Sequence, residues 1–217
     1  MSSDNELKQA VLAELAWEPS VTAAHIGVTA NNGVVTLSGH VKTFMEKHAA
    51  ERAASRVKGV KAVAEEIEVQ LPFEIKRGDE AVAAAAIERL SWDVVVPRDS
   101  VKVKVQSGWI TLTGEVEWHF QKEAAEEDVR KLYGVVGVSN EVTIKPKVNA
   151  SNISDAIGRA TKRLWGFEEP NRVVVTADGG KVRLTGTVHS WHDREVAEST
   201  AWAAPGATAV ENDIAII

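Results

Sequence analysis

Apolar and polar residues alternate along short segments of this chain, and segments with helical composition lie between them. Residues 101–106 read Val-Lys-Val-Lys-Val-Gln, which predicts a strand with one buried face. Ser107-Gly108 then predicts a turn, and residues 109–116 the antiparallel partner strand. Around this hairpin the pattern predicts a helix before it, then a second helix and a last strand after it, at residues 81–90, 121–132 and 138–144.

The same pattern occurs three times along the 217 residues. Each copy has an apolar residue, Leu and then Ser or Thr before a glycine, at residues 35–39, 110–114 and 182–186. A second glycine follows at the same distance in each copy, which gives the pairs Gly39 and Gly59, Gly114 and Gly134, Gly186 and Gly206. A period of more than 70 residues is too long for a solenoid and suits small domains.

The repeated unit therefore predicts an α+β fold of three tandem αββαβ domains. Each domain is expected to form a small three-stranded mixed sheet with two helices on one face. The expected domains are residues 1–74, 78–147 and 151–217. The six glycines are interpreted as structural loop positions, because a tight exit from a strand favours a residue without Cβ. Ligand approach is the alternative, but no phosphate-binding motif surrounds them.

Two groups of aromatic residues are distinguished by their positions in the repeat. Trp17, Trp92 and Trp165 recur at the end of the first helix, where we predict core positions. Trp109 starts a strand and is expected to pack in the hairpin. The second group clusters at the start of the second helix and supplies our candidates for ligand or partner contact, Phe44, Trp118, His119, Phe120 and Trp191.

A hydrophobic staple is the alternative role for aromatics at a helix start. Copies one and three have a capping residue at the start of this helix, Thr43 and Ser190. Copy two has Trp118 at that position, and a tryptophan side chain cannot cap. We therefore expect copy two to differ from the others in its contacts.

Composition excludes several classes of function. The chain has no cysteine, which excludes thiolate catalysis and disulfides, and its net charge of −6 argues against nucleic-acid binding. The six histidines form no recurring set with ligand spacing, so no metal, cofactor or catalytic residue is expected. No apolar run is long enough for a transmembrane span, and residues 1–8 have no signal-peptide character. The sequence as it stands predicts a cytoplasmic protein, or a periplasmic one if a leader has been removed.

The repeated unit resembles the BON domain, a family named for bacterial osmotically inducible and nodulation proteins. The resemblance rests on Leu-(Ser/Thr)-Gly with the later Gly-Val, as in Leu37-Ser38-Gly39 with Gly59-Val60 and Leu112-Thr113-Gly114 with Gly134-Val135. In the third copy Ala207 replaces the valine. The resemblance implies a non-catalytic binding module, since relatives bind anionic phospholipid or accompany envelope proteins, and one cytosolic relative binds potassium.

From this resemblance we expect a non-enzymatic binding or scaffolding protein linked to bacterial osmotic or envelope stress. Its expected partners are an anionic phospholipid surface or another protein. The alternatives are a cytosolic potassium sensor and a self-assembling scaffold.

Overall fold

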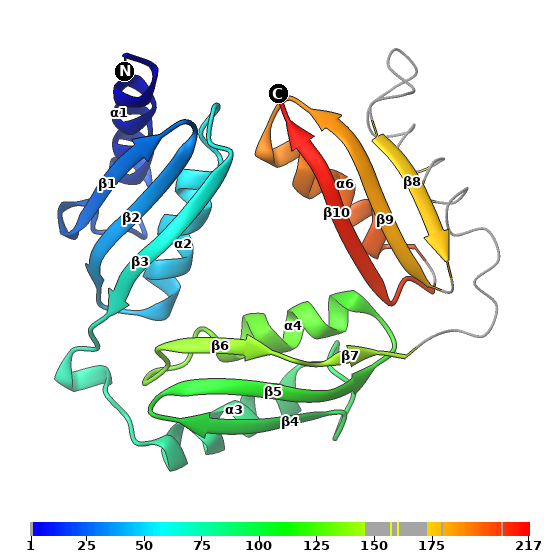
Figure 1. Cartoon of the computed structure of the whole chain (residues 1–217). Coiled ribbons are helices and arrows are strands. Elements are labelled where there is room, and N and C mark those ends of the chain that lie inside the picture. Colours follow the sequence, from blue (N-terminus) through cyan, green and yellow to red (C-terminus); the bar gives the residue numbers. More distant parts are fainter. Residues whose placement is uncertain (1, 146–156, 158–159, 161–172, 179, 205) are drawn as a thin grey trace. The chain divides into compact units, whose positions relative to one another are not determined.

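The computed structural model describes residues 2–145, 157, 160, 173–178, 180–204 and 206–217. Within these residues the predicted three-stranded mixed sheets form, one in each repeat (Figure 1). In each sheet the first two strands are antiparallel and the second and third are parallel. The predicted α+β fold of repeated units is thus confirmed.

The first repeat has the predicted order of elements. They are α1 (Ser2–Trp17), the short η1 (Ala23–His25), β1 (Ile26–Asn31), β2 (Val34–Val41), α2 (Phe44–Ser55) and β3 (Ala62–Val69). Both helices pack on one face of the sheet β1-β2-β3 (Figure 1). The core joins Val11 and Leu15 of α1 to Ala50 of α2 and to Val35 and Leu37 of β2. The opposite sheet face carries polar residues, as the period-two pattern requires.

The second repeat follows a short η2 (Phe73–Ile75). Its elements are α3 (Asp79–Trp92), β4 (Val101–Gln106), β5 (Trp109–Val116), α4 (His119–Val129), β6 (Gly137–Asn140) and β7 (Thr143–Ile144). The hairpin matches the predicted bounds. The predicted last strand is divided, because β6 pairs with residues 109–112 of β5 and β7 pairs with residues 115–116.

The third repeat contains β8 (Val173–Asp178), β9 (Lys181–Val188), α6 (Trp191–Trp202) and β10 (Ala209–Ile216). Its core joins Val182, Leu184 and Ala201 to Ile214 and to Ile157. The predicted position of Trp165 lies outside the described residues.

The glycines of the repeated motif lie close to neighbouring backbone atoms rather than beside an open cavity. Gly39, Gly114 and Gly186 lie inside the second strand of their sheets with φ of 118°, 134° and 124°. A Cβ on Gly114 would come 2.0 Å from the carbonyl oxygen of Ser100. Gly59, Gly134 and Gly206 also have positive φ, just before the last strand. The steric interpretation is therefore supported, although the first three glycines lie within strands rather than at strand exits.

Candidate functional site

The predicted core role of the helix-end tryptophans is wrong in both repeats where the structure describes them. Trp17 is 83% exposed and Trp92 is 77% exposed. The buried face of α3 contains Val82, Ala86 and Leu90, spaced four residues apart. Trp92 follows Leu90 by two residues, about 200° around the helix, and therefore points away from the sheet. In α1 the same spacing separates the buried Leu15 from Trp17.

In the second repeat, more apolar surface surrounds the exposed tryptophan. After Trp92, the chain continues through Val94, which is 98% exposed, and Val95, which is also exposed. Ile87, five residues before Trp92 on α3, is exposed as well. We call these four side chains together with Arg98 the α3 tip. Exposed apolar side chains concentrated in one short segment make that segment a candidate contact surface.

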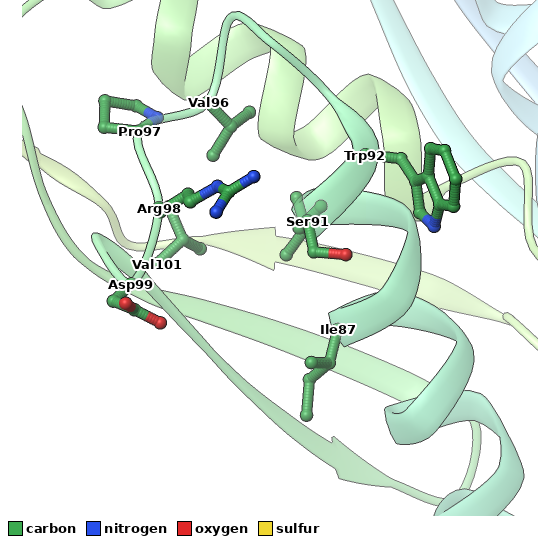
Figure 2. A pocket seen from close by; sticks show the side chains of 9 residues that line it. Ile87, Ser91, Trp92, Val96, Pro97, Arg98, Asp99 and Val101 are labelled. Carbon is green, nitrogen blue, oxygen red and sulfur yellow. The ribbon is translucent and has the colours of Figure 1, made fainter.

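A pocket of about 600 Å³ opens beside the α3 tip and is drawn in Figure 2. Its walls come from the end of α3 and from the loop that leads to β4. Figure 2 shows the Arg98 guanidinium extended between Val96 and Ser91, with the Trp92 indole at the end of α3. In the described part of the chain Arg98 has neither an ion pair nor a side-chain hydrogen bond. The pocket thus places an unpaired cation in a mixed lining, in which apolar side chains lie beside the polar Ser91 and Asp99.

Two aspartates, one of them buried, hold the end of α3 in place. Asp93, the residue after α3, accepts a hydrogen bond from the Val95 N–H at 2.6 Å and so fixes the exposed loop. On α4, the buried Asp128 forms an ion pair with the Arg89 Nε at 2.9 Å. Burial raises the pKa of Asp128, the nearby Asp93 carboxyl group raises it further, and Arg89 opposes both effects. The Arg89–Asp128 ion pair therefore connects the end of α3 to the second helix of this repeat.

The corresponding end of α1 has different chemistry. Arg56 pairs there with Glu14 and Glu18, each at 3.1 Å. Trp17 is followed by Glu18 and Pro19 rather than by valines. The first repeat therefore has the exposed indole without the apolar loop or the unpaired arginine.

The contact candidates predicted from sequence lie at the starts of α2, α4 and α6, as expected. Phe44, Trp118, His119 and Trp191 are half-buried, whereas Phe120 is 54% exposed. Trp118 and Phe120 stack with ring centroids 6.3 Å apart, and the Arg194 guanidinium lies 5.2 Å from the Trp191 ring centre. His119 lies 3.5 Å from Glu123, one turn further along α4. Their role in binding stays a prediction.

The start of α4 is capped in spite of Trp118. The Gln121 Oε1 accepts hydrogen bonds from the N–H groups of Glu117 and Trp118, at 3.0 and 3.1 Å. In the other repeats, Thr43 and Ser190 cap as predicted, accepting from Glu46 N and Asp193 N. A glutamine three residues into a helix is the second half of a capping box, so this signal was present in the sequence.

Among the described residues, no three His, Asp or Glu side chains gather closely enough to hold a metal ion. No helix in the same part of the chain has the length and apolar content needed to cross a membrane.

Comparison with known proteins decides the family. The sequence profile of the BON domain matches residues 3–70, 78–146 and 149–217. The chain belongs to the BON domain family. The chain is also 30% identical to Osmotically-inducible protein Y of Escherichia coli (strain K12) over 146 residues, which are 65% of this chain and 73% of that protein. It is thus a BON-domain protein related to an osmotically inducible one.

Two solved structures of CdsD, a structural protein of the type III secretion system of Chlamydia trachomatis, also match this BON protein. Both are 18% identical and cover 98% of this chain, with 92% and 98% of their own chains covered. Their TM-score is 0.26, which is too low to bear on fold or function.

Proposed function

We propose that this BON protein is a non-catalytic binding protein of the osmotic stress response that attaches to anionic phospholipid surfaces through the α3 tip of its second repeat. The observation that carries the proposal is the unpaired Arg98 beside exposed Trp92 and Val94. The relative's name, an osmotically inducible protein, supports the link to stress.

The apolar part of the α3 tip suits the boundary between headgroups and acyl chains. Tryptophan is enriched at that boundary because its ring is apolar and its N–H still needs a polar partner. Val94 and Val95 offer β-branched apolar groups on a loop that Asp93 fixes in place. Burying such side chains is favourable in proportion to the apolar area removed from water.

The polar part of the α3 tip selects for phosphate. An arginine presents a planar group of N–H donors that fits a phosphate with two parallel hydrogen bonds. Since Arg98 has no carboxylate partner among the described residues, its donors are available to a lipid headgroup. One cation adds only about 1 kcal/mol near an anionic surface, so we expect weak and reversible attachment.

The test is flotation of the full chain with vesicles of phosphatidylcholine alone or mixed with phosphatidylglycerol. We expect the protein to float with the mixed vesicles, and expect Trp92→Ala with Val94→Ser to lower its partition about tenfold. Arg98→Gln should reduce the preference for the anionic vesicles. Because Trp17 has no apolar loop beside it, Trp17→Ala is the matched control and should float like the unchanged protein.

The proposal is wrong if the unchanged chain does not float with anionic vesicles, or if the Trp92 and Val94 variant floats as well as the Trp17 variant. Capture of a protein partner through Trp92 without any flotation would also contradict it. The melting temperature of each variant should stay near that of the unchanged chain, because all these side chains are exposed.

A further inference from the structure

The outer face of the second sheet carries an indole that lies flat against the strands. Trp109 of β5 stands opposite Gly137 of β6, and a Cβ on Gly137 would come 2.4 Å from two of its ring carbons. The Trp109 Nε1 donates a hydrogen bond to the Ser139 Oγ at 2.9 Å. Gly137 leaves room for the ring, and Ser139 fixes its edge. Trp109 remains 47% exposed.

The strand register places two lysines and two threonines on the same sheet face as this ring, beyond Gln106, which stands directly opposite Trp109. Lys104 lies opposite Thr111, and Lys102 lies opposite Thr113, all on the same sheet face as Trp109. Both lysines are exposed, and neither has an ion pair among the described residues. Further along β5, the Glu115 carboxylate already pairs with Lys145 at 3.7 Å. The face around the indole is therefore locally basic although the repeat as a whole is acidic.

The other repeats lack this arrangement at the same register positions. In the first repeat Val34 stands opposite Ala62, and in the third Lys181 stands opposite Ala209. The residues that correspond to Lys104 are Thr29 and Thr176. Because the aromatic ring, the glycine beneath it and both lysines occur together in one repeat, they are not needed to form the BON fold.

We propose that this face of the second repeat binds an acidic polysaccharide, a chain of sugar rings that carry carboxylates. The electron-rich face of an indole attracts the C–H groups on one face of a sugar ring, and a flat, fixed indole can stack on such a ring. Lys102 and Lys104 lie about 7 Å apart along an extended strand, so they can pair with carboxylates on neighbouring rings. Thr111 and Thr113 offer hydroxyl groups to the sugar hydroxyls.

Single-stranded nucleic acid is the less suitable occupant. Its affinity comes mainly from many cations along a phosphate backbone. This face has two lysines, in a chain of net charge −6. A polysaccharide with one carboxylate per ring needs fewer cations and gains more from hydroxyl contacts. The proposal does not depend on phospholipid binding, since the α3 tip involves the helix end and its loop rather than this sheet face.

The test is electrophoresis of the full chain in native gels to which polygalacturonate is covalently fixed, with its methyl ester as the neutral counterpart. We expect polygalacturonate to retard the protein and the methyl ester to have little effect. Trp109→Ala should weaken the affinity about tenfold or more, since it removes the stacking surface. Lys102→Gln with Lys104→Gln should weaken it as well, and these exposed changes should leave the melting temperature unaltered.

Gly137→Ala tests whether the ring must lie flat, because the new methyl group displaces the indole without removing it. It should weaken retardation, whereas Trp92→Ala should leave retardation unchanged and so separates this site from the α3 tip. The proposal is overturned if the unchanged chain is not retarded, if the methyl ester retards it equally, or if the lysine variant binds as before. Stronger binding of an oligothymidylate than of polygalacturonate would likewise overturn it.

Discussion

Gly39 and its counterpart Gly114 combine a positive φ with a close backbone neighbour, and Gly186 in the third repeat shares the positive φ. A Cβ on Gly39 would lie 2.1 Å from the carbonyl oxygen of His25, the residue just before β1. That oxygen belongs to the backbone, so the contact cannot be relieved by a change of rotamer. The glycine thus allows the start of β1 to lie against the middle of β2, and it serves the fold rather than a ligand.

Gly39→Ala should therefore destabilise the first repeat by about 2 kcal/mol or more, from backbone strain and overpacking together. Gly78→Ala is the control, because no atom lies within 4 Å of a Cβ at that helix start and its φ is negative. Chemical denaturation of both variants measures the difference. Equal stability of the two would contradict the steric account of the motif.

At the scale of residues, the spacing of motif residues along the chain led to correct predictions. Predictions of which way a side chain points were wrong for the helix-end tryptophans Trp17 and Trp92. Fixed intervals between glycines predicted the three repeats, and the alternation of apolar and polar residues predicted the hairpins that the structure shows. The exposure of Trp92 could have been predicted from its distance of two residues from Leu90, but recurrence was interpreted as burial. The contact of Trp109 with Gly137 and Ser139 depends on strand register across 28 and 30 residues, which the local pattern does not contain.

At the scale of elements, each of the first two repeats joins the end of its first helix to its second helix by an ion pair. In the first repeat the arginine is at the end of the second helix. There Arg56 pairs with Glu14 of α1 and with Glu18, just after α1, and both glutamates are partly exposed. In the second repeat Arg89 is on the first helix and its partner, Asp128, is buried. Both repeats thus connect their two helices by an ion pair, but the arginine and the carboxylate have exchanged helices, and only the second repeat buries the carboxylate.

Arg89→Met should cost more stability than Arg56→Met. Without Arg89, the buried Asp128 loses its cation while its other oxygen already lacks a hydrogen-bond donor, so we expect a loss of about 1–3 kcal/mol. Arg56 and its partners remain open to water, which replaces the lost contacts. Thermal melts of both variants at neutral pH decide the order. An Arg56 variant that melts lower than the Arg89 variant would contradict this explanation.

At the scale of the whole molecule, the described cores of the first and third repeats contain residues of their own repeat alone. The first runs from Leu7 to Val69, and the third from Ile157 to Ile216. Contact functions can therefore differ between repeats while the packing pattern stays the same. The second repeat illustrates this. The apolar loop of the α3 tip and the sheet face around Trp109 are both exposed, and neither is part of the buried core.

Separate cores predict separate folding. A fragment of residues 78–147 should fold alone, with the circular dichroism of a helix-and-sheet domain, although a unit of this size has small stability. Leu112 is fully buried in the second repeat, so Leu112→Ala should cost about 2–5 kcal/mol there. In the full chain this variant should lower one melting transition and leave the transition of the first repeat in place. If the fragment is unfolded while the full chain is folded, or if Leu112→Ala lowers every transition together, contacts between repeats belong to the core and the prediction of three folding units is wrong.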